Sequence, residues 1–157
     1  MFHGINGFDK ARYLGKWYEI ARFDFSFERG LNHTSAEYTL GNNRFIRVVN
    51  QGYNQNKKEW EKATGKARFV GSDTVAELEV SFFGPFYGGY NVIALDKDYQ
   101  YALVAGISTK YLWILSRTKT IPENIRSEYL AMAKANGFEI DRLVWIDQSD
   151  STAPQNP

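Results

Sequence analysis

The chain has 157 residues, of which 19 are basic and 18 acidic, so its net charge is +1. This length suits one domain with a single core, and an aromatic content of 16% is too high for a disordered chain. The nearly neutral, mixed charge does not favour a nucleic-acid partner. The absence of cysteine excludes disulfide scaffolds, thiolate metal sites and cysteine catalysis.

The first predicted strand covers residues 15–23 and follows an extended lead-in at residues 1–14. Its alternation places Trp17, Glu19 and Ala21 on one face, which we expect to point inward. A buried carboxylate needs a partner or a proton. We therefore expect Glu19 to pair with an arginine or a tyrosine hydroxyl low in the barrel or to contact a ligand, unless the strand register turns it outward.

An unusually apolar loop follows this strand, because residues 24–32 include Phe25, Phe27 and Leu31. Loops normally lie at the surface. Two interpretations stay open: these side chains pack beneath the loop, or they form a lid at the mouth of an apolar opening.

Short strands separated by turn residues make up the next part of the chain, with one strand about every 8–12 residues. They are predicted at residues 35–40, 44–53, 60–70, 74–83, 90–95, 101–107 and 110–117. This spacing is typical of an all-β sandwich or barrel. Strands that are apolar on one face only and are joined by short turns favour a closed up-and-down barrel over residues 15–117. A barrel of about eight strands has room for side chains or for one small ligand.

Small side chains on the predicted inner face favour a cavity over a solid core. The small residues are Ala36, Ala63, Ala67 and Ala105. Further apolar positions expected to line the cavity are Tyr38, Val48, Leu78, Val80, Phe82, Val92, Leu103 and Trp113, whereas Val104 and Leu112 are expected outside. Asn50, Tyr90 and Tyr111 are the polar groups expected to orient a ligand's head group.

The hydrophobic period changes after the barrel, which predicts an amphipathic helix over about 121–136. Thr120 and Glu123 have the spacing of a capping box, and Asn136-Gly137 supplies a stop. We expect this helix outside the barrel, followed by a short strand at 143–146 and a flexible tail at 147–157.

No catalytic motif is visible, so we expect a binding protein without catalytic residues or a cofactor. The two histidines, His3 and His33, have no second ligand near them in the sequence, and no metal site is predicted. Asp96 and Asp98 flank a turn and are expected to cap it rather than to form a carboxylate pair.

Three short motifs occur in an order that resembles the lipocalin signature. They are Gly15-Lys16-Trp17 at the first strand, Asp98-Tyr99 in mid-chain and Arg117 at the end of a late strand. The wider stretches at 22–30, 81–90 and 111–118 are similar to the bacterial lipocalins of the outer-membrane lipoprotein type.

This resemblance implies an eight-stranded antiparallel barrel closed at one end, where Arg117 crosses the indole of Trp17. It also implies a hydrophobic ligand, either a fatty acid or a lysophospholipid, and a monomer or weak homodimer in the periplasm or at the outer membrane. Bacterial members carry a lipid on an N-terminal cysteine. This chain has neither cysteine nor a visible leader, so an anchor would require a preceding segment.

Two alternative functions stay open. One is a carrier of a tetrapyrrole or another pigment on the same fold, for which His33 is the candidate axial ligand. The other is an interaction module whose barrel is filled by its own side chains and takes no ligand.

Overall fold

The computed structural model describes residues 2–24, 29–42, 44–83 and 86–149. The strands are β1 (Gly15–Phe23), β2 (Leu31–Leu40), β3 (Ile46–Asn54), β4 (Glu59–Phe69), β5 (Glu77–Phe83), β6 (Phe86–Leu95), β7 (Tyr101–Ala105), β8 (Leu112–Ser116) and β9 (Leu143–Trp145). The helices are α1 (Lys10–Tyr13) and α2 (Glu123–Ala135), with a 3-10 turn at Ile140–Arg142.

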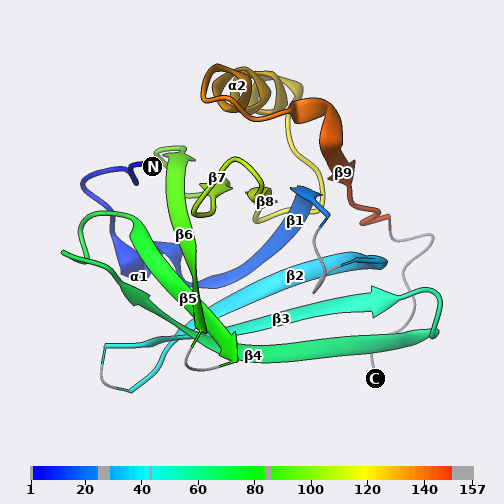
Figure 1. The fold of residues 1–157 in the computed structure, drawn as a ribbon, viewed down its shortest axis with the longest axis horizontal. Coiled ribbons are helices and arrows are strands. Elements are labelled where there is room, and N and C mark those ends of the chain that lie inside the picture. The colour runs from blue at the N-terminus through cyan, green and yellow to red at the C-terminus, as the bar shows by residue number, and fades with distance from the viewer. Residues whose placement is uncertain (1, 25–28, 43, 84–85, 150–157) are drawn as a thin grey trace.

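A closed antiparallel barrel is formed by β1 to β8, as predicted. Each strand pairs with the next one along the chain, and β1 pairs with both β2 and β8, which closes the ring. The ninth strand pairs with the far end of β1, outside the ring. Figure 1 shows β2, β3 and β4 as long, nearly parallel ribbons on the side of the barrel away from α2.

The end of the barrel next to α1 is closed. Trp17 is fully buried there, and the guanidinium carbon of Arg117 lies 3.9 Å from the centroid of its ring. The same guanidinium donates hydrogen bonds to the backbone carbonyls of Arg12, Leu14, Lys16 and Tyr99. The predicted stacking of Arg117 on Trp17 is therefore confirmed. The turn between β3 and β4 lies at the opposite end (Figure 1).

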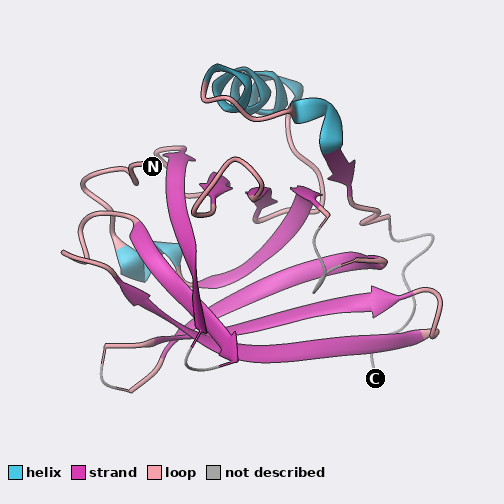
Figure 2. Ribbon diagram, in the orientation of Figure 1, coloured by secondary structure: helices cyan, strands magenta, loops and turns pink. Residues whose placement is uncertain are grey.

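The helix α2 packs on the outside of the barrel, as predicted (Figure 2). Tyr129 and Ala133 are buried in a cluster with residues of β7 and β8, and the Tyr129 hydroxyl donates to the carbonyl of Tyr101 at 2.9 Å. The predicted capping box is wrong, because the residue at the N-cap is Pro122 and no side chain bonds there. Gly137 ends the helix with a φ of 89°, as expected.

The predicted assignment to inner and outer faces is wrong at four positions. A β-bulge between Glu19 and Ala21 turns Ala21 to the outside, where it joins the cluster beneath α2. Leu103 and Ala105 also belong to this outer cluster, whereas Val104, expected outside, lies in the barrel interior.

Several predicted boundaries also change. The second strand begins at Leu31, so this residue lies in the sheet and not in the loop. The sixth strand begins at Phe86, inside the predicted glycine-rich loop, and the lead-in contains the short helix α1. Gln148 is buried, so residues 147–149 do not belong to a flexible tail. No described helix has the length and apolar character needed to span a membrane.

Candidate functional site

The inner wall of the barrel carries most of the residues predicted to line a cavity. Ala36, Tyr38, Val48, Leu78 and Val92 are buried in the interior cluster, and Val80, Phe82, Tyr90 and Trp113 lie half-buried against it. Gly65 lets the inner wall pack closely, because a Cβ there would lie 2.7 Å from the ring of Phe82. Alternate residues of each strand thus form one apolar surface.

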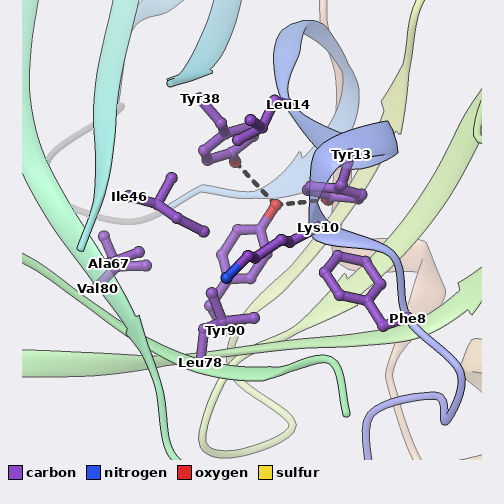
Figure 3. Close-up of a pocket in the computed structure, with 10 residues that line it drawn as sticks. All are labelled: Phe8, Lys10, Tyr13, Leu14, Tyr38, Ile46, Ala67, Leu78, Val80 and Tyr90. Carbon is purple, nitrogen blue, oxygen red and sulfur yellow. Dashed lines mark hydrogen bonds between the residues drawn. The ribbon is translucent and has the colours of Figure 1, made fainter. Parts of the chain in front are cut away.

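A small pocket lies at the closed end, and five of the residues predicted on the inner face line it: Tyr38, Ala67, Leu78, Val80 and Tyr90. Its remaining lining comes from Phe8, Lys10, Tyr13, Leu14 and Ile46 (Figure 3). The aliphatic and aromatic carbons of these side chains make it an apolar floor at the closed end of the barrel.

Three tyrosine hydroxyls meet at this floor. The Tyr90 hydroxyl lies 2.7 Å from that of Tyr13 and 2.8 Å from that of Tyr38 (Figure 3). Tyr90 therefore does not stand at the rim as a group for a ligand's head, as we had expected. Burial raises the pKa of Tyr90, and its two tyrosine neighbours raise it further; burial also raises the pKa of Tyr13. Tyr13 and Tyr90 are therefore neutral at physiological pH.

A second polar cluster lies on the inner wall nearer the open end. Because of the bulge in β1, Glu19 and Arg22 both face inward, opposite Leu115 and Trp113 of β8. Arg22 donates to the Glu19 carboxylate at 3.2 Å, and the Thr34 hydroxyl donates to the same oxygen at 3.0 Å. The expectation that Glu19 pairs with an arginine is confirmed.

The guanidinium of Arg22 makes further contacts with the β1–β2 region. It donates to the Leu31 carbonyl at 3.0 Å and to the Asp24 carboxylate at 3.5 Å. Its side chain is only 1% exposed. The ion pair is thus buried in the wall and held from both strands.

The chain after β9 bridges β1 and β2 next to this cluster. Pairing between these two strands ends at Tyr18 and Ser35. Beyond that point the side-chain amide of Gln148 donates to the carbonyls of Glu19 and Thr34, at 2.8 Å each. The backbone N–H of Ile146 donates to the carbonyl of Ile20, and the backbone N–H of His33 donates to the carbonyl of Asp147. Residues 146–148 therefore fill the seam where β1 and β2 separate, and we call them the seam segment.

The open half of the barrel is polar and less filled. Asn50 and Ala63 pair with each other across β3 and β4, in the same row as the inward Ala36. Ala63 is exposed although it points into the barrel, so the space in front of it is open. Farther out, the Asn54 side chain donates to Glu61 at 2.7 Å.

The remaining predicted mouth residues have different positions. Tyr111 lies in the β7–β8 turn, where its Cβ packs over Gly106, and it is half-buried. Leu31 is half-buried and packs over Gly52. Phe25 and Phe27 lie outside the described residues, so the choice between lid and packed loop stays a hypothesis.

The candidate axial ligand His33 lies outside the cavity. Its ring centroid is 6.5 Å from that of Trp60, and Trp60 faces outward, because it is three residues before the inward Ala63 on an unbroken strand. Among the described residues, no group of three or more His, Asp or Glu side chains is arranged to hold a metal ion.

Sequence reasoning missed Arg22 and Gln148, whereas Phe8 and Tyr13 of the lead-in lie at the closed end, where they were expected to plug the barrel. A strict two-residue alternation puts Arg22 outside, and only the bulge reverses this. Gln148 follows the last strand and belongs to no periodic pattern.

Comparisons with known proteins agree with this geometry. Residues 8–148 match the family model described as a lipocalin-like domain. The outer membrane lipoprotein Blc of Escherichia coli strain K12 is 53% identical over 147 residues, which cover 94% of this chain and 83% of that protein. The protein of the same name from Citrobacter freundii is 55% identical over 92% of this chain and 81% of its own length.

A more distant sequence relative and one solved structure are also similar to this chain. Temperature-induced lipocalin-1 of Arabidopsis thaliana is 34% identical, with 97% of this chain and 86% of that protein covered. The structure of insecticyanin from the tobacco hornworm superposes with a TM-score of 0.77 over 96% of this chain and 86% of that one. At 19% identity, it supports the fold alone.

Proposed function

The chain belongs to the lipocalin-like family, and from that premise we propose that it binds a single-chain amphipathic lipid, a fatty acid or a lysophospholipid, in the barrel. We further propose that it works in the bacterial cell envelope, as the names of its outer membrane lipoprotein relatives suggest. This function is binding and transport or storage, not catalysis.

The gradient of polarity along the inner wall is the observation that carries this proposal. The closed end is an apolar floor, and the open half bears the polar side chains of Asn50 and of the Glu19–Arg22 pair. An acyl chain directed toward the floor gains about 0.8 kcal/mol per buried CH₂, and the polar half accommodates the head group. A single chain with one polar end matches this order of surfaces.

The two alternative functions have less support. The hypothesis of a pigment carrier has no support from His33, the candidate axial ligand, because this residue packs outside the cavity against Trp60. A barrel filled by its own side chains does not agree with the exposure of the inward-facing Ala63.

A pair of neighbouring positions on β4 tests the proposal. Ala63 faces inward and Thr64 outward, and both are exposed. We expect A63F to weaken binding of a delipidated protein to long-chain fatty acids and lysophospholipids at least about tenfold, and T64F to change it less than about twofold. The readout is tryptophan fluorescence during titration, with W113F as the control for the reporting residue.

Chain length provides the second arm of the experiment. Affinity should rise about three- to fourfold per added methylene until the cavity is full, and then level off. A response that does not depend on chain length, or equal affinities for A63F and T64F, would place the ligand outside the barrel. Native mass spectrometry of the purified protein then identifies any retained lipid.

A further inference from the structure

One wall of the barrel is covered and the opposite one is bare. The helix α2 packs over residues of β7, β8 and the end of β1. Figure 2 shows β2, β3 and β4 on the other side, and no described element packs over their outer surface. Within the described ranges, the side chains on that surface are therefore not covered by another helix or strand.

The strand register identifies the outward residues of this wall. Trp17, Ala36, Val48 and Ala67 are in the interior cluster, so their strand neighbours face outward. The basic outward residues are Lys16, Arg47, Lys62, Lys66 and Arg68, all exposed, and we call this surface the basic face. The acidic outward residues in the same rows are Glu37 and Glu79.

The basic face carries a net charge of +3, from five basic and two acidic side chains, although the whole chain carries +1. The rest of the molecule is consequently net negative. Arg68 forms an ion pair with Glu79 at 3.1 Å, whereas Arg47, Lys62 and Lys66 form no ion pair with a described residue. The positive charge of this face is thus mostly uncompensated.

Aromatic rings lie among these cations. Lys66 Nζ lies 4.7 Å from the centroid of Phe45, Lys16 Nζ lies 5.1 Å from Tyr18, and the guanidinium of Arg68 lies 4.0 Å from Tyr87. Long basic side chains beside half-exposed aromatic rings suit the boundary between phosphate head groups and acyl chains. An acidic protein as the partner would explain the basic side chains but not the aromatic rings beside them.

We propose that the basic face docks the barrel on an anionic lipid surface. The site is separate from the cavity, so docking and ligand binding are independent properties. Five basic residues with two acidic neighbours give weak, reversible, salt-sensitive attachment, of the strength that serves as a second signal beside another anchor.

The test is sedimentation of the full chain with vesicles of phosphatidylcholine containing about one quarter phosphatidylglycerol, compared with phosphatidylcholine alone. We expect the protein to bind the anionic vesicles at low salt and to lose that binding at roughly 0.5 M salt. We expect no binding to the neutral vesicles. Equal binding to both kinds of vesicle, or no binding to either, would refute the proposal.

Two charge-reversal variants locate the contact. K62E/K66E should reduce vesicle binding about tenfold or more. The matched control K97E/K110E makes the same change in net charge on exposed residues away from the basic face, and should change binding less than about twofold. Equal loss in both variants would mean that net charge alone decides, and would overturn the assignment to this face.

The fatty-acid titration separates this proposal from the proposed function. K62E/K66E should bind a fatty acid like the parent, because neither lysine faces the cavity. A variant that binds ligand but not vesicles supports docking through the basic face.

Discussion

The buried ion pair in the barrel wall predicts a large and specific loss of stability for Arg22→Met. The Arg22 side chain is 1% exposed and that of Glu19 is 6% exposed, so both charges depend on the protein for solvation. Without the guanidinium, the Glu19 carboxylate keeps one described side-chain donor, the Thr34 hydroxyl at 3.0 Å.

Removing one partner of a buried pair typically costs about 3–5 kcal/mol, because the other charge stays buried without compensation. For a chain of this size, each kcal/mol lowers Tm by about 2–4 °C, so R22M should melt roughly 6–20 °C below the parent. Urea denaturation monitored by circular dichroism measures the free energy of unfolding directly, provided that the m-value is unchanged.

Two further variants control for trivial causes. E19Q/R22M removes both charges and should recover about half or more of the loss, because the uncompensated carboxylate is gone. R68M breaks an exposed pair of similar length, 3.1 Å to Glu79, and should cost less than about 1 kcal/mol. If R22M and R68M cost the same, or if the double variant is no more stable than R22M, the account of Glu19 and Arg22 is wrong.

Three other predictions concern the closed end and the seam of the barrel. R117A should lose about 2–3 kcal/mol of unfolding free energy. R117K should be intermediate, because lysine keeps the charge but not the planar set of donors. Equal urea midpoints for R117A and the parent would contradict this prediction. The contribution of Tyr13 and Tyr90 to stability should be constant below pH 10.0, the ordinary pKa of tyrosine, and should fall above it. The reason is that the unfolded chain releases the two phenolic protons at a lower pH than the folded protein does. The urea midpoint of Y13F/Y90F should therefore fall less steeply above pH 10.0 than that of the parent. Q148A should cost about 1–3 kcal/mol by leaving two buried carbonyls unpaired, and hydrogen exchange should rise at residues 31–35; Q100A, which removes an exposed bond, is the control.

The sequence predicted the barrel, the outer helix and the contact between Trp17 and Arg117. Strands whose outer face is wet alternate clearly, and β2 to β5 could be assigned to inner and outer faces for that reason. The motif residues supplied the closed end, because their combination resembles one family.

The assignment of residues to the inner or outer face was wrong where both sides of a strand are buried. β7 reads Tyr-Ala-Leu-Val-Ala, with the barrel interior on one side and α2 on the other, so alternation contains no signal and Leu103 was placed inward. β1 has the same difficulty, and its bulge leaves no mark in the sequence. The Glu19–Arg22 pair, three residues apart, therefore needed coordinates.

The seam segment has a consequence for the order in which the barrel forms. Gln148 bonds Glu19 across 129 residues of chain, and Arg117 bonds Arg12 across 105. Contacts between such distant residues form slowly, because a long loop must close before they stabilise anything. The first strand leaves the ribosome long before β8, its partner in closing the ring, and before Gln148. The ring therefore cannot close until β8 has been synthesised, and the seam between β1 and β2 is completed only later, when Gln148 binds the carbonyls of Glu19 and Thr34.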